Sequence, residues 1–196
     1  MSQLKLNYAL ERIHADIAAE RFSFDEIINE KTLAAEYGVS KTPVREALNI
    51  LCHQGILVKY SGKGYFLKEL SFSEFCMLRE LRFMLESGII KKLIEKSSDE
   101  ELQQLLDTVD ANWNGYPENL AFHFRLAEMT KNVLVEQEIK NIFNRFIRQR
   151  TLEDQHFDIT ESHRSIVKAL LARDEKLALK CLKDDLIPPH DEMIWT

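Results

Sequence analysis

The sequence predicts a mostly α-helical protein with two domains. Residues 1–70 are expected to form a winged helix-turn-helix, in which helices carry a small β-hairpin wing, and residues 71–196 an all-α bundle of six helices. Two observations predict this division. A glycine-containing turn at residues 38–40 joins two short helical segments and is followed by a hairpin pattern, whereas the apolar patterns after residue 73 all have helical spacing.

The first domain begins with an expected helix over residues 4–21, whose apolar residues recur at helical spacing and would cover the back of the motif. A short linker, residues 22–28, leads to a second helical segment that ends at Tyr37. The turn at residues 38–40 then precedes a third helix. Helix, tight turn and helix in this order form the helix-turn-helix arrangement.

The third helix is expected to open at Thr42, whose hydroxyl suits a capping position. Pro43 would be its first helical residue, where the missing N–H would have no partner in any case. Four apolar residues follow at helical spacing and predict one buried stripe. They are Val44, Ala47, Leu48 and Leu51.

A hairpin pattern follows the third helix. Residues 56–58 and 65–67 have strand character, and the segment SGKG at residues 61–64 predicts a tight turn between them. A wing that contacts DNA needs backbone that can approach phosphate closely and a positive charge, and this turn offers both. The pattern therefore favours DNA binding over a small helical core domain with a hairpin attached.

The charge distribution agrees with a DNA-binding first domain, although the chain as a whole has a net charge of −6. Residues 1–70 contain nine Lys or Arg and nine Asp or Glu, so this part is neutral. The entire acidic excess therefore lies in the remainder of the chain, away from the expected DNA-contacting face.

Six helices with short connections are expected after residue 73. Ser98 and Asp174 are residue types that start helices, and Pro188-Pro189 would end the last one. The expected helices span residues 73–96, 99–112, 117–130, 132–154, 159–172 and 174–186.

The composition is that of an ordinary globular protein, with 45% hydrophobic and 30% charged residues. No apolar run approaches the roughly 18 residues of a membrane span, and the N-terminus has no signal-peptide pattern. Cys52, Cys76 and Cys181 are widely spaced, which fits a reducing compartment and argues against a disulfide framework. We therefore expect a cytoplasmic protein that does not bind a membrane.

Two histidines of the second domain lie among apolar residues. His123 follows Asn119 by one helical turn, and His163 has apolar residues at i+3 and i+4. Asp185 lies late in the last expected helix. A histidine in such a pattern is more often a hydrogen-bonded core residue than a ligand, so the pattern alone leaves both interpretations open.

The first domain resembles the winged helix of GntR-type transcriptional regulators. The resemblance spans residues 6–70 and rests on LAAEYGVSKTPVREAL at residues 33–48, L-x-x-x-G-I-L at residues 51–57, and the G-K-G turn. Lys41 stands where the family more often has Arg, and because Lys cannot form a bidentate contact with guanine, we expect it on a phosphate. The resemblance implies that DNA is contacted by Lys31, Ser40, Lys41, Thr42, Arg45, Gly62 and Lys63.

The second domain is similar to the FCD ligand-binding domain of FadR-like GntR regulators, in its shorter VanR-like branch. The matching motifs are LRFMLE at residues 81–86, FHxxLA at residues 122–127 and ESHRxIxxAL at residues 161–170. Many such domains hold a divalent metal with one Asp and three His, and the metal and nearby basic groups bind a small organic acid. The matching positions here are Asn119, His123, His163 and Asp185.

Two of these four positions depart from the family pattern. Asn119 can still ligate through its carbonyl oxygen and Asp185 supplies a carboxylate, a set that suits zinc, nickel or manganese. A metal-free site in which both residues hydrogen-bond the histidines fits the same departures. The resemblance also implies Arg82 as an effector-binding residue, whereas other arginines, such as Arg145 and Arg148, fit a solvated helix face as well.

Together, these features indicate an effector-responsive transcriptional regulator, a repressor by resemblance, that binds near-palindromic operator DNA as a homodimer. Its effector would be a small organic acid. One alternative is a metal-dependent enzyme with an appended winged helix, because two histidines and a carboxylate can activate water, but no further catalytic motif is present and we expect no enzyme. The other is a winged helix that binds protein instead of DNA.

Overall fold

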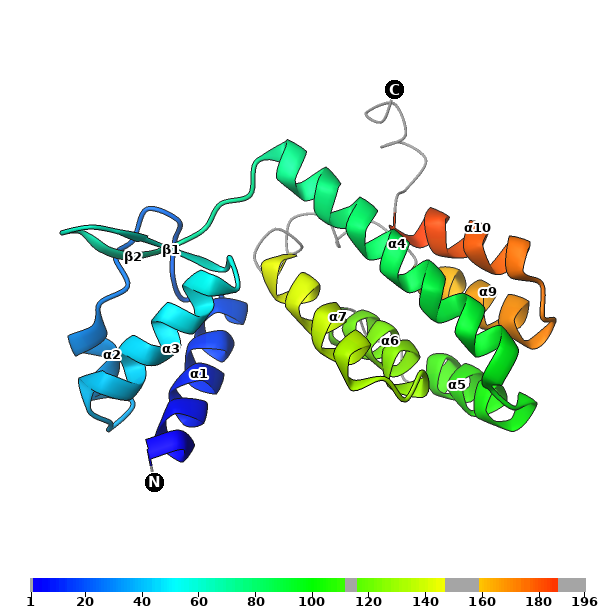
Figure 1. Cartoon of the computed structure of the whole chain (residues 1–196), viewed down its shortest axis with the longest axis horizontal. Coiled ribbons are helices and arrows are strands. Elements are labelled where there is room, and N and C mark those ends of the chain that lie inside the picture. The colour runs from blue at the N-terminus through cyan, green and yellow to red at the C-terminus, as the bar shows by residue number, and fades with distance from the viewer. Residues whose placement is uncertain (1, 112–115, 147–158, 187–196) are drawn as a thin grey trace. The chain divides into compact units, whose positions relative to one another are not determined.

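The computed structural model describes residues 2–111, 116–146 and 159–186 (Figure 1). The chain is mostly helical and folds into two compact units: the first contains residues 2–71 and 144–146, and the second contains the other described residues from Phe72 onward. The first unit contains a helix-turn-helix with a two-stranded wing, and the described part of the second is entirely helical. This is the fold class that the sequence predicts.

The first unit consists of three helices followed by an antiparallel hairpin, in which Leu57 is opposite Leu67 and Tyr60 is opposite Gly64. Both α1 and α2 pack against α3. The elements are α1 (Ser2–Ala18), α2 (Glu30–Glu36), α3 (Lys41–His53), β1 (Leu57–Tyr60) and β2 (Gly64–Leu67).

The core of the first unit is formed by one face of α3 and one face of α1. The expected stripe of Val44, Ala47, Leu48 and Leu51 is completely buried, as the i, i+3, i+4, i+7 spacing requires. Three residues of α1 pack into the same core: Ala9, Ile13 and Ile17.

The start of α3 differs from the expectation. Lys41 is its first residue and Ser40 occupies the capping position, so Thr42 is not the cap and Pro43 is the third helical residue. Pro43 is tolerated there because the first N–H groups of a helix have no intrahelical partner. The Ser40 side chain makes no capping hydrogen bond, whereas Asn29 caps α2 by accepting from the backbone N–H groups of Lys31 and Thr32.

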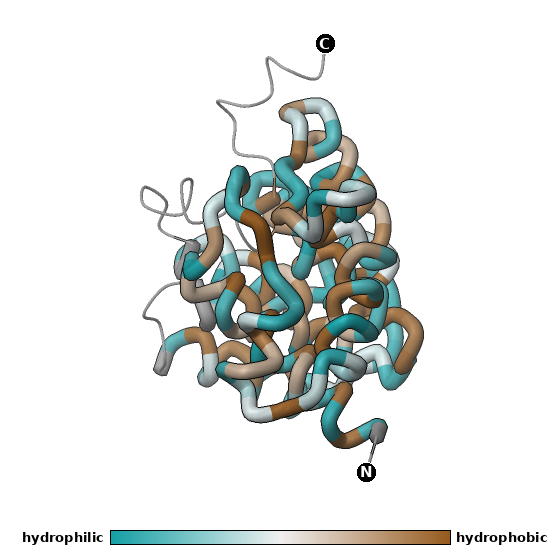
Figure 2. Tube along the Cα trace, turned by 90° about the vertical axis from the view of Figure 1, so that its left-hand side faces the viewer, coloured by the Kyte–Doolittle hydropathy of each residue, from teal (hydrophilic) through white to brown (hydrophobic). Residues whose placement is uncertain are grey.

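All secondary-structure elements described in the second unit are helices. Its core combines apolar residues from all of its described helices. Along the chain, hydrophobic and hydrophilic residues follow one another at short intervals, as amphipathic elements require (Figure 2). The helices are α4 (Phe72–Lys96), α5 (Asp99–Ala111), α6 (Tyr116–Met129), α7 (Val133–Phe146), α9 (Ile159–Leu171) and α10 (Glu175–Leu186).

Local capping explains two of the expected helix starts. Ser98 and Glu101 form a reciprocal capping box at α5: the Glu101 N–H donates to Ser98 Oγ over 3.2 Å, and the Ser98 N–H donates to Glu101 Oε2 over 3.0 Å. Asp174 accepts from the Leu177 N–H at the start of α10. The expected end of the 132–154 helix and the stop at Pro188-Pro189 lie outside the described residues. Among the helices that the structure describes, none has the length and apolar character needed to cross a membrane.

Candidate functional site

The first unit exposes every residue that the sequence assigns to DNA contact. Lys31 lies on α2, Ser40 directly before α3, and Gly62 with Lys63 in the turn of the wing; all are exposed. Gly62 has a φ of +74°, a left-handed conformation that favours glycine. The three remaining residues lie in the exposed first turns of α3: Lys41, Thr42 and Arg45.

Arg45 is held by a carboxylate from the preceding helix. Its Nε donates to both carboxylate oxygens of Glu30 at 3.0 Å, and its Nη2 lies 2.9 Å from Glu30 Oε2. Hydrogen bonding from Arg45, more than its charge, lowers the pKa of Glu30. The Arg45 side chain is 56% exposed, so Glu30 fixes its direction while leaving the guanidinium accessible to DNA.

The wing is tied to α3 by a buried tyrosine of β2. The Tyr65 hydroxyl donates to Asn49 Oδ1 over 2.9 Å and accepts from Lys59 Nζ over 3.1 Å. Tyr65 therefore fixes the base of the wing against α3. Its tip remains open, because a Cβ added at Gly62 would meet no atom within 4 Å.

The second unit contains a group of buried polar and charged side chains, which we call the buried polar cluster. These residues come from four helices: α4, α6, α9 and α10. Buried polar groups are costly unless they bond to one another or to a ligand. The cluster consists of Arg82, Glu86, Asn119, His123, His163 and Asp185.

A chain of hydrogen bonds begins at Arg82 and Glu86, one turn apart on the buried face of α4. Arg82 Nε donates to Glu86 Oε1 over 2.5 Å, and Glu86 Oε2 lies 2.6 Å from His123 Nδ1. Burial acts to raise the pKa of Glu86, but the charges and hydrogen bonds of Arg82 and His123 outweigh it and lower the pKa to about 2. Because an ionised carboxylate only accepts, His123 Nδ1 carries the hydrogen and Nε2 is directed elsewhere.

His123 Nε2 is directed at Asp185, which also faces the second histidine. His123 Nε2 lies 3.3 Å from Asp185 Oδ2, and His163 Nε2 lies 3.5 Å from Asp185 Oδ1. Ser162 Oγ donates to the same Asp185 oxygen over 2.6 Å. One ligand atom each from His123, His163 and Asp185 all lie within 4.8 Å of one another, an arrangement that could hold a metal ion.

The protonation states suit metal ligation. Burial lowers the pKa of His163 to about 3, although Asp185 acts in the opposite sense, so the contact between them joins a neutral ring to a carboxylate and is not an ion pair. Burial acts to raise the pKa of Asp185, but the polar groups that face it outweigh burial and lower the pKa, so this carboxylate is ionised. Neutral imidazole and ionised carboxylate are the forms in which these groups bind metals.

The spacing of these atoms also fits a shared metal. Two ligand atoms about 2.1 Å from one ion lie about 3 Å apart at octahedral angles and slightly farther apart at tetrahedral angles, close to the distances from Asp185 to both histidines. Asn119 lies one turn before His123 on α6, and its buried Oδ1 has no hydrogen-bond partner among the described residues. A buried carbonyl oxygen without a partner is available to a ligand.

Arg82 gives the cluster a positive charge. Its guanidinium stacks over the Phe143 ring at 4.2 Å, and its buried Nη2 has no hydrogen-bond partner within the described part of the chain. An unpaired buried guanidinium nitrogen is a donor that a carboxylate ligand can satisfy. Other arginines differ: Arg125 and Arg145 are exposed, Arg164 pairs with Asp110 and Glu161, and Arg148 lies outside the described residues.

The sequence interpretation missed Glu86 and Ser162 as members of this site. Glu86 belongs to a motif that supported the family resemblance, but it was not assigned a role. Its position carried the signal: Glu86 follows Arg82 by four residues on a helix face that otherwise bears Phe75, Leu78 and Ile89. Two opposite charges on an otherwise apolar helix face indicate a buried ion pair. Because burying such a pair costs desolvation free energy, it is a candidate for a functional role.

An exposed basic face on a helix-turn-helix, a glycine wing and a separate helical unit with a buried polar cluster define a winged-helix transcriptional regulator. Comparison with known proteins identifies the family. Residues 7–67 match the family described as "Bacterial regulatory proteins, gntR family", and residues 77–186 match the FCD domain family. The chain therefore belongs to the GntR family of bacterial transcriptional regulators and carries an FCD domain.

Individual relatives agree with this assignment. The chain is 32% identical over 159 residues to the Nta operon transcriptional regulator of Aminobacter aminovorans, covering 76% of each protein. It is 25% identical over 190 residues to the gluconate operon transcriptional repressor of Bacillus licheniformis, covering 86% of this chain and 77% of that protein. The solved structure of E. coli McbR/YncC has the same fold, with a TM-score of 0.74, 20% identity, and coverage of 97% of this chain and 96% of that chain.

Both domains are found in transcriptional regulators, and the two named relatives are transcriptional regulators and not enzymes. The enzyme alternative is therefore not supported. GntR domains bind DNA and FCD domains bind small-molecule effectors, so the chain is a DNA-binding regulator with an effector-type second domain.

Proposed function

We propose that this chain is a cytoplasmic repressor that binds a near-palindromic operator as a homodimer and changes its DNA affinity when a small organic acid enters the buried polar cluster. The observation that carries the proposal is the position of a buried, incompletely bonded Arg82 guanidinium within a cluster of two histidines and a carboxylate. A carboxylate ligand would find both a cationic donor and a metal-binding set there.

In the first unit, DNA contact would be made by the exposed residues of α2, α3 and the wing. Arg45, oriented by Glu30, is the candidate for base contact, because a guanidinium can bind a guanine edge with two donors. Lys63 at the wing and Lys41 at the start of α3 are candidates for phosphate contact. The remaining proposed contacts are Lys31, Ser40, Thr42 and Gly62.

In the second unit, a zinc, nickel or manganese ion would be held by His123, His163, Asp185 and Asn119. When bound, such an ion would offer open coordination positions to an acid. Glu86 would orient His123 through Nδ1, and Ser162 would orient Asp185. Arg82 would pair with the acid directly. The protein-binding alternative for the winged helix has no specific observation in its favour.

Metal binding is tested by calorimetric titration of the metal-free protein with zinc, nickel and manganese ions. We expect one equivalent of at least one metal to bind to the wild type, and its affinity to fall about tenfold to a hundredfold or more in His123→Ala and His163→Ala. His53→Ala is the matched control, because His53 is an exposed histidine at the end of α3 and should leave metal binding unchanged. Absence of binding in the wild type, or equal binding by all variants, would contradict the proposed metal site.

Acid binding is tested separately by the thermal stability of the metal-loaded protein in a panel of mono-, di- and tricarboxylic acids. We expect one class of acid to raise the melting temperature of the wild type but not of Arg82→Ala. Arg125→Ala is the control for the loss of an arginine, because Arg125 is exposed on the surface of α6. An equal response of Arg82→Ala and the wild type would exclude Arg82 as the anion-binding group.

A further inference from the structure

Asn49 lies at the centre of the solvent-facing side of α3 and does not belong to the DNA contacts that the family resemblance implies. An α-helix turns by about 100° per residue, so Thr42, Arg45 and Asn49 share one face of α3. This face is opposite to the buried stripe that includes Val44 and Leu51. Thr42 and Arg45 are exposed, whereas Asn49 is partly buried. The face that would meet DNA therefore continues one turn beyond Arg45.

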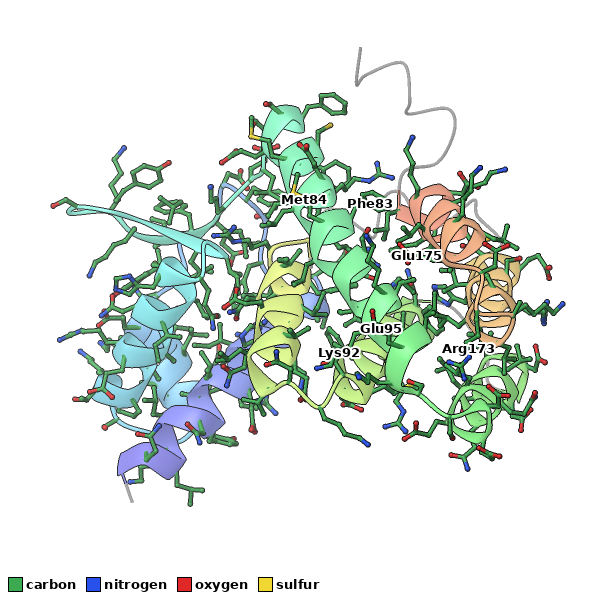
Figure 3. The ribbon with its side chains drawn as sticks, turned by 45° about the vertical axis from the view of Figure 1, so that its right-hand side comes forward. Phe83, Met84, Lys92, Glu95, Arg173 and Glu175 are labelled. Atoms are coloured by element: carbon green, nitrogen blue, oxygen red, sulfur yellow. The ribbon has the colours of Figure 1, made fainter. Side chains whose placement is uncertain are left out.

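The wing contacts one side of Asn49. Figure 3 shows the hairpin next to α3, with side chains between the two elements. Tyr65 of β2 is buried, and its hydroxyl lies 2.9 Å from Asn49 Oδ1. Lys59 Nζ of β1 lies 3.1 Å from the same hydroxyl. The side chain of Asn49 is therefore held in place by the wing.

The Lys59 ammonium fixes the direction of the hydrogen bond to Asn49. An ammonium group only donates, so the Tyr65 oxygen accepts from Lys59 and its single hydrogen is donated to Asn49 Oδ1. Arg45, and to a smaller extent Tyr65, lower the pKa of Glu30, but both Glu30 oxygens already accept from Arg45. Asn49 Nδ2 then points away from Tyr65, and within the described residues neither of its hydrogens has an acceptor.

An amide that can only donate recognises different bases from a free amide. A free asparagine binds adenine with one donor and one acceptor. With Oδ1 bonded to Tyr65, Asn49 offers only the two hydrogens of Nδ2. The acceptors in the major groove are N7 and O6 of guanine, N7 of adenine and O4 of thymine, whereas cytosine presents a donor. Guanine fits best, because its two acceptors are adjacent, and cytosine is rejected.

The charges near Asn49 favour a base edge over a phosphate. Glu46 is exposed one turn before Asn49 on the same side of α3, and its carboxylate repels a phosphate. The cations proposed for phosphate contact lie elsewhere, Lys41 at the start of α3 and Lys63 in the turn of the wing. Phosphate contacts at these two places would set the register in which Asn49 meets a base.

We infer that Asn49 is a further base-reading residue of α3, held by Tyr65 so that its amide donates to a guanine or another acceptor-bearing base in the major groove. Arg45 precedes Asn49 by four residues, about 6 Å along the helix axis, so both contact the same half-site. Tyr65 is a positioning residue that acts through Asn49. The inference rests on the proposed operator binding and adds a residue that determines its sequence specificity.

Selection of sites from random-sequence DNA, followed by fluorescence anisotropy on the selected sites, tests the base contact. Asn49→Asp keeps the shape of the side chain and replaces its donors by an acceptor. At one position of each half-site, this variant should lose the preference for an acceptor-bearing base by about tenfold or more and favour cytosine instead. Asn49→Ala, which adds no charge, should lose the preference at the same position without gaining one for cytosine. Equal weakening on all sequences in both variants would overturn the base contact.

The role of Tyr65 is tested on the same sites with Tyr65→Phe, which removes only the hydroxyl. The amide of Asn49 can then turn over, so discrimination at the position that Asn49 reads should fall several-fold in favour of adenine. The other positions should keep their preferences, which a general loosening of the wing would not allow. Tyr8→Phe is the matched control, because Tyr8 is exposed on α1. Discrimination equal to that of the wild type in Tyr65→Phe would overturn the positioning role.

The outcomes separate this inference from the proposed function. A wild type that enriches no DNA sequence would overturn both the proposed operator binding and the base contact. A wild type that enriches a near-palindromic site, together with Asn49→Asp and Asn49→Ala variants that enrich the same site, would overturn only the role of Asn49. A change confined to one base position in each half-site supports the inference.

Discussion

Glu86 connects the charge that would bind the effector to the histidine that would bind the metal, and its replacement tests whether this connection is real. The Glu86→Gln variant keeps the size of the side chain and removes its negative charge. Arg82 then loses its buried ion-pair partner, and His123 Nδ1 faces an amide in place of a carboxylate. We expect a large loss of stability, because the remaining guanidinium is buried without compensation.

The magnitude follows from the structure in two ways. Although burial acts to raise its pKa, Glu86 has a pKa of about 2 instead of the ordinary 4.5, which corresponds to about 3 kcal/mol of stability at neutral pH. Removing one partner of a buried ion pair costs about 3–5 kcal/mol in other proteins. Because the folded-state pKa is lowered, this stabilisation is present above pH 4.5 and is lost as the pH falls through about 2.

The assay is chemical denaturation at pH 7 in the presence of a chelator, followed by circular dichroism. We expect Glu86→Gln to lower the free energy of unfolding by about 3 kcal/mol, and the melting temperature by roughly 10 °C or more. Glu95→Gln is the control, because Glu95 is exposed on the same helix and should change stability by about 0.5 kcal/mol or less. Equal stability of the two variants would refute the reasoning.

Three further predictions concern the first unit. Arg45→Ala should weaken operator binding by about 10- to 100-fold in fluorescence anisotropy without changing the circular dichroism spectrum; unchanged affinity would show that α3 does not read the DNA as proposed. Lys63→Ala should weaken binding to all DNA sequences alike, and it should reduce the slope of the logarithm of the binding constant against the logarithm of the salt concentration by about one. A sequence-dependent loss of affinity would instead place Lys63 on a base. Gly64→Ala should destabilise the unit by about 1–3 kcal/mol in thermal melts, because φ is +127° and the new Cβ would lie 2.9 Å from Ile27 Cγ2; a melting curve like that of the wild type would contradict this strain.

Much of the fold could be predicted from the sequence because local signals agree with one another. The spacing of Val44, Ala47, Leu48 and Leu51 predicted the buried face of α3, and the capping residues Ser98 and Asp174 predicted the starts of α5 and α10. The predicted start of α3 was wrong by two residues, since Ser40, Thr42 and Pro43 are all compatible with a helix N-terminus and only the packing of α3 decides between them.

The buried polar cluster could be predicted only in part. His123, His163 and Asp185 were grouped by resemblance, and the structure brings them together. Glu86 was missed, because sequence periodicity shows that a residue lies on a buried face but not which polar atoms from other helices meet it there. The hydrogen bond between Glu86 and His123 joins residues 37 positions apart in the sequence. The packing of α4 against α6 brings these two residues together.

The most direct measurement is the affinity for an operator, selected from random-sequence DNA, with and without metal and the acid identified by thermal stability. We expect metal and acid together to change the operator dissociation constant of the wild type by about fivefold or more, in keeping with typical coupling between two sites. In His163→Ala and Arg82→Ala the change should be absent, while affinity without ligand stays near that of the wild type. Operator affinity that does not respond in the wild type, or responds equally in both variants, would contradict control of DNA binding by the buried polar cluster.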